Sequence, residues 1–152
     1  MRVEYTASMI LSKTILILED DLKTLSLILD RLAELEGDQP YDLSTIVLTN
    51  HVQVQELING GKNINYDIIL LDRDCKLGGS FHVLDIEKFG PERVISISSV
   101  PEYNEQAKKR GVSRIVLKDN KHLDVFADLL KKEIEIFLKS TTLSEKNIHH
   151  IF

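Results

Sequence analysis

Three acids, a serine and a lysine each stand at the end of a short apolar stretch of the sequence. Glu19 and Asp20 follow TILIL, Asp72 follows DIILL, Ser98 closes VISIS and Lys118 closes RIVLK. Carboxylates that lie close together repel one another, and a hard divalent cation such as Mg²⁺ relieves that repulsion. A carboxylate can also attack phosphorus, while an ammonium and a hydroxyl stabilise the phosphoryl oxygens. Together these residues provide the groups needed for phosphoryl transfer to an aspartate.

The elements that must bring these five residues together alternate along the chain. Continuous apolar runs predict strands over residues 14–18, 44–49, 67–71, 93–98 and 113–117. Apolar residues spaced three and four apart, together with cap and stop residues, predict helices between and after the strands. These helices are one carrying the stripe Leu22, Leu25, Leu29 and Leu32, short ones over residues 52–58 and 82–89, one capped by Ser99 and ended by Gly111, and a long one from residue 123.

The alternation predicts an α/β fold. Strands that are apolar on both faces and separated by helices form a parallel sheet covered on both sides. Right-handed crossovers favour a doubly wound arrangement. We therefore expect a flavodoxin-like, five-stranded parallel sheet in the order 2-1-3-4-5, with helices on both faces. Such sheets carry their chemistry beyond the carboxyl ends of the strands, which is where the five residues stand.

Residues 14–139 resemble the receiver domain of two-component response regulators in the motifs ILILEDD, DIILLD, VISIS and RIVLK. The resemblance implies that Asp72 accepts a phosphoryl group from a histidine kinase or phosphotransfer protein. It also implies that Lys118 pairs with that group and that the Ser98 hydroxyl moves toward it. The chain is then a receiver domain over residues 14–139, with an N-terminal arm at 1–13 and a C-terminal tail at 140–152.

The same resemblance implies a Mg²⁺ site. Asp20 and Asp72 bind the ion directly, the backbone carbonyl of Asp74 is a third ligand, and Glu19 acts largely through water. Simpler roles compete with these at two positions. Asp21 is expected to cap the helix that follows it, because carboxylates favour the positive end of the helix dipole. The Asp74 side chain can equally be that of an ordinary turn residue.

Three departures from the family pattern leave alternatives open. The loop RDCKLGG after Asp72 lacks the usual proline, Asp119 follows Lys118 where proline is usual, and Ile115 stands where an aromatic residue is common. These changes motivate a second hypothesis, a pseudo-receiver that binds partners without being phosphorylated. A third hypothesis, a Toprim-like Mg²⁺-dependent enzyme acting on nucleic acid, leaves Ser98 and Lys118 without a role. On the first two hypotheses the chain is a signalling domain rather than an enzyme.

Composition narrows the partners and the compartment. The formal net charge of −5 argues against direct binding of nucleic acid. No apolar run approaches the roughly 20 residues of a membrane span, and the first residues do not resemble a signal peptide. The single cysteine, Cys75, fits a reducing cytoplasm. We expect a downstream protein partner, and the long final helix also allows the chain to form a homodimer.

Overall fold

The structure is a computed structural model, and it describes residues 10–38, 40–61 and 64–151, with residues 142–151 as backbone alone. Five strands form one parallel sheet in the order β2-β1-β3-β4-β5. The strands are β1 (Leu11–Leu18), β2 (Tyr41–Leu48), β3 (Ile68–Leu71), β4 (Val94–Ser96) and β5 (Arg114–Ile115). The predicted doubly wound, flavodoxin-like fold is therefore confirmed.

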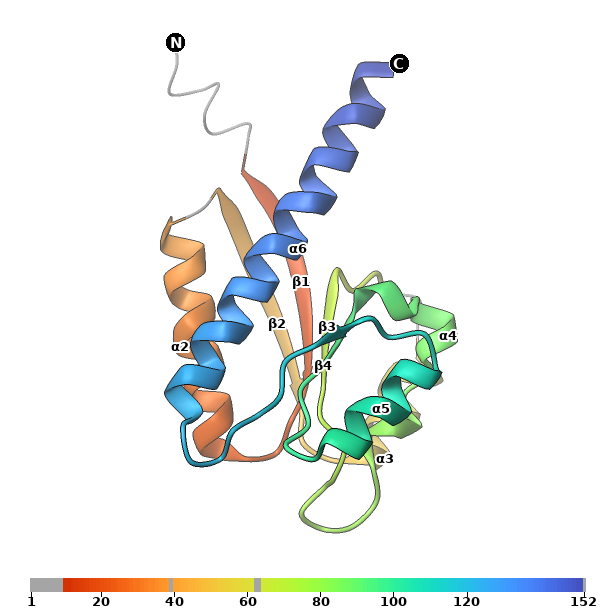
Figure 1. Cartoon of the computed structure of the whole chain (residues 1–152). Coiled ribbons are helices and arrows are strands. Elements are labelled where there is room, and N and C mark those ends of the chain that lie inside the picture. The colour runs from red at the N-terminus through yellow and green to blue at the C-terminus, as the bar shows by residue number, and fades with distance from the viewer. Residues whose placement is uncertain (1–9, 39, 62–63, 152) are drawn as a thin grey trace.

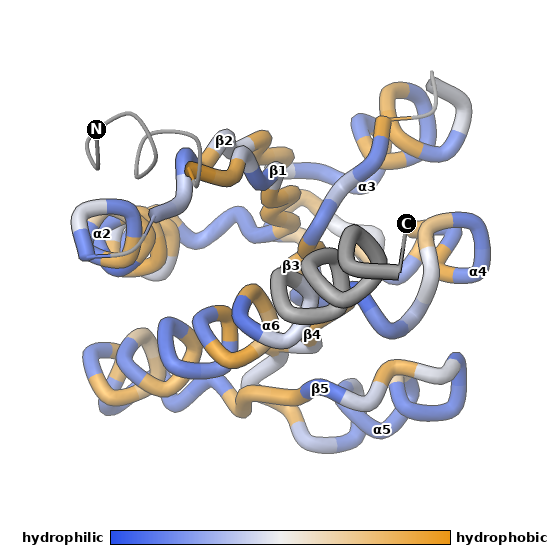
Figure 2. Tube along the Cα trace, turned by 90° about the horizontal axis from the view of Figure 1, so that it is seen from above, coloured by the Kyte–Doolittle hydropathy of each residue, from blue (hydrophilic) through white to orange (hydrophobic). Residues whose placement is uncertain are grey.

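Helices cover both faces of this sheet (Figures 1 and 2). Seen from above in Figure 2, helices lie on both sides of the row of strands. One layer holds α2 (Leu22–Asp38) and α6 (Leu123–Ile151). The opposite layer holds α3 (His51–Gln53), which continues as a π-helical turn over Val54–Asn59, α4 (Ile86–Phe89) and α5 (Pro101–Lys109).

The core lies in two layers, one on each side of the sheet. Along β1, Ile15 and Ile17 pack toward α2 and α6, while Leu16 and Leu18 pack toward the opposite helices. This alternation follows from the two-residue period of a strand, whose successive side chains point to opposite faces. Because both faces are covered, all four residues are fully buried, and the strand reads as a continuous apolar run.

The buried face of α2 differs from the predicted stripe. Leu25 and Leu32 are buried as expected, but Leu22 is 72% exposed and Leu29 is 40% exposed. The helix instead buries Ile28, one residue away from Leu29. Leucines occur on both sides of this helix, so spacing alone did not identify the side that packs on the sheet.

Three further elements are shorter or start differently than predicted. Val100, not Ser99, precedes α5 as its cap residue, and it makes no side-chain capping bond. The predicted helix over residues 82–89 is divided into a 3₁₀ turn at Phe81–Val83 and the single turn α4. The last strand, β5, has two residues instead of the five predicted over 113–117.

At both ends, regular structure extends past the predicted domain limits. Strand β1 begins at Leu11, so residues 11–13 of the predicted N-terminal arm pair with β2, while residues 1–9 lie outside the described chain. The backbone of α6 runs to Ile151 through the predicted C-terminal tail, and residue 152 is not described. The division into a receiver domain and two extensions remains a prediction.

Candidate functional site

Two neighbouring strands place Glu19 and Asp72 beside each other at the carboxyl edge of the sheet. Leu18 at the end of β1 pairs with Leu71 at the end of β3, and each acid is the next residue along its chain. The Asp72 amide donates to the Leu18 carbonyl over 3.1 Å, which holds the two backbones together at this point. Both side chains are buried, with residue exposures of 0% for Glu19 and 7% for Asp72.

Lys118 brings a cation to both of these carboxylates. Its ammonium donates to Glu19 Oε2 over 2.8 Å and to Asp72 Oδ2 over 3.2 Å. The residue is 8% exposed and follows the short edge strand β5. Its backbone is held as well, because the Lys118 amide donates to the Ser98 carbonyl over 3.2 Å. The structure thus joins side chains that lie 46 and 99 residues apart in the sequence.

Burial in this cluster makes the Glu19 carboxyl harder to ionise. Burial raises the pKa of the Glu19 carboxyl from 4.5 to about 7, and the nearby charge of Asp72 adds to the rise despite the opposing effect of Lys118. Burial acts to lower the pKa of Lys118, but the charges of Glu19 and Asp72 outweigh it and raise that pKa. One ammonium therefore serves two buried acids and stays protonated.

The loop after β1 fixes the acids by backbone hydrogen bonds. Glu19 Oε1 accepts from the amides of Asp20 and Asp21, each over 3.0 Å. Asp21 Oδ2 accepts from the amide of Thr24 over 3.0 Å and from its hydroxyl over 2.6 Å, so this aspartate caps α2 as expected. These bonds from Thr24 lower the pKa of Asp21. Asp21 is thus occupied by the start of the helix.

Asp20 and Asp74 lie in the two loops that flank the buried cluster. Asp20 Oδ2 accepts from the Lys76 amide over 2.6 Å, which ties the loop after β1 to the loop after β3. The Asp74 side chain is 59% exposed and pairs with Arg73 over 2.7 Å. Asp74 also forms an isolated antiparallel bridge with Ser80, so its backbone is part of a closed turn.

Ser98 lies past the end of β4 and is 2% exposed. The backbone between it and β3 is tied, because the Ile97 amide donates to the Leu71 carbonyl over 2.9 Å. The Ser98 hydroxyl oxygen accepts from the Val100 amide over 3.1 Å. Within the described chain, however, its own proton has no hydrogen-bond acceptor. Ser98 therefore offers a free donor at the edge of the sheet that carries Asp72.

Sequence reasoning missed one buried polar residue of this region, Asn104 on α5. It is 3% exposed, and its side-chain oxygen accepts from the Ser98 amide over 3.1 Å and from the Ser96 hydroxyl over 2.6 Å. Its side-chain nitrogen donates to the Ser98 carbonyl over 3.1 Å. An asparagine in the helical segment PEYNEQAKK looks like a surface residue, and the sequence carries no other signal for its burial.

The donor set fits a hard divalent cation. The acids around Glu19 supply oxygen ligands. Burial and then the charge of Asp72 raise the pKa of the Glu19 carboxyl, and a cation beside it would offset this cost of ionising the group. Among residues 10–38, 40–61 and 64–151, no group of three or more His, Cys, Asp or Glu side chains is arranged as a ready metal site. Mg²⁺ retains several waters, so two carboxylates and a backbone carbonyl are enough for it.

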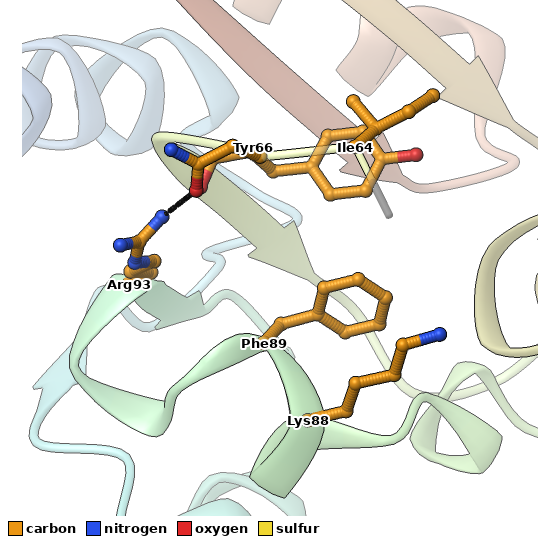
Figure 3. Close-up of a pocket in the computed structure, with 6 residues that line it drawn as sticks. Ile64, Tyr66, Lys88, Phe89 and Arg93 are labelled. Carbon is orange, nitrogen blue, oxygen red and sulfur yellow. Dashed lines mark hydrogen bonds between the residues drawn. The ribbon is translucent and has the colours of Figure 1, made fainter. Parts of the chain in front are cut away.

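A hollow of about 380 Å³ lies elsewhere, beside the starts of β3 and β4 (Figure 3). Tyr66 and Phe89 meet edge to face in its wall, with ring centroids 5.7 Å apart. Arg93 donates to the Tyr66 carbonyl over 3.0 Å, and Lys88 Nζ donates to the Asn59 carbonyl over 2.8 Å. None of the predicted site residues lines this hollow, because they stand at the opposite ends of the strands.

Solved structures that match this one identify the fold. Over 85% of this chain and 96% of the other, the structure matches the phosphorylated cyanobacterial phytochrome response regulator RcpA, with a TM-score of 0.66 and 19% identity. The Mn²⁺-bound response regulator Rcp1 matches over 83% and 94% of the two chains, with a TM-score of 0.63 and 19% identity. The chain has the receiver fold. A response regulator receiver domain from Rhodospirillum rubrum agrees, with a TM-score of 0.60 and 15% identity over 81% and 94% of the chains.

Sequence comparison alone does not reach this result. No protein-family model matches the sequence, and no curated protein matches it either. The architecture, together with the strand-end motifs of the sequence, therefore supports the receiver fold. In the part of the chain that the structure describes, no helix has the length and apolar character needed to span a membrane.

Proposed function

We propose that this receiver fold acts as the response regulator receiver of a phosphorelay, with Asp72 as its phosphoacceptor. The observation that carries the proposal is the buried Lys118 ammonium, 3.2 Å from Asp72 Oδ2 and 2.8 Å from Glu19 Oε2. A lysine is costly to bury, and pairing it with two acids at a strand end suits a site that must accept a dianionic group.

The reaction follows from the groups at this edge of the sheet. An oxygen of the Asp72 carboxylate attacks the phosphorus of a phosphohistidine or a small acyl phosphate, and the bond from phosphorus to the donor breaks. The leaving group keeps the electron pair, and Asp72 becomes an acyl phosphate. Lys118 stays protonated and pairs with the phosphoryl oxygens. The Ser98 hydroxyl turns its free proton toward them.

The loops hold the groups that position this chemistry. Asp20, Asp72 and the backbone carbonyl of Asp74 would hold Mg²⁺, with Glu19 acting through water. The ion, when bound, neutralises charge on the phosphoryl oxygens. Asp20 is already held by the Lys76 amide, so its carboxylate has one oxygen engaged before any ion arrives. Glu19 must be deprotonated to take part, which its raised pKa makes dependent on pH near neutrality.

The proposal also defines the partners. The phosphoryl donor is a histidine kinase or a phosphotransfer protein, and the phosphorylated chain changes its affinity for a downstream protein. Such relays operate in the cytoplasm and need no direct contact with nucleic acid. A homodimer through α6 is compatible with this role. No substrate is turned over, apart from the transfer to Asp72 and its hydrolysis.

Phosphorylation by a small donor tests the proposal directly. The full chain is incubated with acetyl phosphate and Mg²⁺, and its intact mass should rise by one phosphoryl group. The rise should vanish in Asp72→Asn and in the presence of a chelator. Asp21→Asn is a matched control, because Asp21 is engaged in capping α2. A rise that persists in Asp72→Asn would move the site, and no rise at all would favour the pseudo-receiver.

A further inference from the structure

Helix α5 is tied to the candidate site by the buried amide of Asn104. This side chain bonds both backbone groups of Ser98, accepting from its amide and donating to its carbonyl, each over 3.1 Å. Two bonds of this kind imitate the pairing that a neighbouring strand would give. They reach Ser98 beyond Ser96, the last residue of β4.

These two bonds, here called the Ser98 clamp, restrict how Ser98 can move when a phosphoryl group is present on Asp72. With its amide and carbonyl both held, Ser98 can turn its hydroxyl about the side-chain bond without losing either backbone contact. Any larger displacement must carry Asn104, and hence α5, along with it. The Ser98 carbonyl also accepts from the Lys118 amide, so the same peptide joins the lysine of the site to the helix.

A second contact links α5 to the other side of the site. Arg73, which follows Asp72, places its guanidinium 3.9 Å from the centroid of the Tyr103 ring and donates to Gln106 Oε1 over 3.3 Å. Tyr103 and Gln106 lie on α5 to either side of Asn104 in sequence. The helix therefore touches both loops in which a phosphoryl group on Asp72 would create new charge.

We propose that Asn104 is a positioning residue that couples Ser98 to α5, so that α5 reports the state of Asp72. The proposal rests on the function proposed above. When the phosphoryl oxygens draw Ser98 further than a turn of its hydroxyl allows, the two bonds from Asn104 transmit the displacement of the Ser98 backbone to the helix. Without them, the loop between β4 and α5 would absorb the movement.

The test uses the full chain with Mg²⁺ and beryllofluoride, which mimics a phosphoryl group. Occupancy is followed by the ¹⁹F resonance of the bound ion, and hydrogen exchange is measured for the amides of α5. In the natural sequence we expect bound beryllofluoride to change α5 exchange by roughly fivefold or more, the lower end of typical coupling. In Asn104→Ala the ion should still bind, but this ratio of exchange rates should fall toward one, leaving only what the contacts of Arg73 with α5 transmit.

Ser96→Ala is the matched control, because it removes one bond to Asn104 and leaves the Ser98 clamp in place. It should keep the full ratio. A purely structural role would accelerate exchange equally with and without the ion, and would leave the ratio unchanged. If Asn104→Ala does not fold, Asn104→Asp keeps the size of the side chain and loses the donor to the Ser98 carbonyl, and a reduced ratio is again expected.

The outcomes separate the two proposals. Normal occupancy with an undiminished ratio in the Asn104 variants would overturn the coupling and leave the phosphoacceptor assignment intact. Equal losses in Ser96→Ala and Asn104→Ala would also overturn it, because the Ser98 clamp would then not be the cause. Failure of the natural sequence to take up either beryllofluoride or a phosphoryl group would overturn the proposed function, and the coupling with it.

Discussion

Replacing Glu19 with glutamine should remove the part of the pH dependence of stability that comes from ionising this buried carboxyl. Glu19 has a pKa of about 7 in the folded chain, raised from 4.5 by burial and by Asp72. At pH 4.5 and below, the Glu19 carboxyl is protonated in the folded chain, and the stability that this neutral group contributes is fully present. As the pH rises through about 7, the folded chain must ionise this buried group and that contribution is lost.

The size of the effect follows from the pKa difference. The interval from 4.5 to about 7 corresponds to about 3 kcal/mol of unfolding free energy, because each pKa unit is worth about 1.4 kcal/mol. Glutamine cannot ionise, so Glu19→Gln does not undergo this loss. Its stability relative to the natural sequence should rise by about 3 kcal/mol between pH 4.5 and pH 8. The hydrogen bond from Lys118 to Glu19 is one of the causes that set this pKa, so its loss is included in the difference.

Urea denaturation from pH 4.5 to pH 8 with a chelator present measures this difference. Comparing the two proteins at each pH cancels the titration of the groups that do not interact with Glu19. Adding Mg²⁺ at pH 8 should then stabilise the natural sequence more than Glu19→Gln, because the ion offsets the buried charge. A stability difference that stays constant across the pH range would refute the assignment of a buried carboxyl with a raised pKa at Glu19.

Three further predictions concern the site and the loops around it. Lys118→Met leaves Glu19 and Asp72 without a cation, and urea denaturation at pH 8 should show a loss of about 3 kcal/mol. Burial, aided by the charges of Arg110 and Arg73, lowers the pKa of His82 to about 4, so the NMR resonances of its ring protons should not shift between pH 8 and 5.5. The stability that the neutral ring contributes should be lost as the pH falls from 6.5 through about 4. Gly78→Ala and Gly79→Ala both place alanine at a positive φ, but only at Gly79 does the new methyl meet the His51 ring. Thermal and urea denaturation should therefore show a loss of unfolding free energy of about 1 kcal/mol for Gly78→Ala and about 3 kcal/mol for Gly79→Ala.

The part of the site that follows the strands could be predicted from the sequence. Glu19 and Asp72 each come after a run of fully buried aliphatic residues, and a parallel sheet places the ends of adjacent strands together. Lys118 could be predicted in the same way, although its strand β5 is only two residues long. These predictions needed the order of the strands but no detail of helix packing.

What depends on helix packing could not be predicted. Leu22 and Leu29 share the spacing of a buried stripe yet lie outward, because α2 contacts the sheet and α6 through a neighbouring line of residues. Asn104 was missed for a related reason. Its helix has one fully buried apolar residue, Ala107, among mostly polar and charged residues, so its pattern does not reveal that a polar side chain faces inward. Burial of a polar group follows from its partners, which here lie six and eight residues earlier in the chain.

The composition of the buried cluster itself argues that it serves chemistry instead of stability. An isolated buried ion pair rarely improves on packed apolar residues, and here one ammonium faces two carboxylates, so negative charge remains uncompensated. A fold selected only for stability would replace Glu19, whose pKa near 7 measures the cost of keeping it there. In the proposed function, this negative charge would attract a divalent cation, while Lys118 would prevent the same charge from repelling an incoming phosphoryl group. In the proposed function, each of the three side chains is therefore needed for the other two to act.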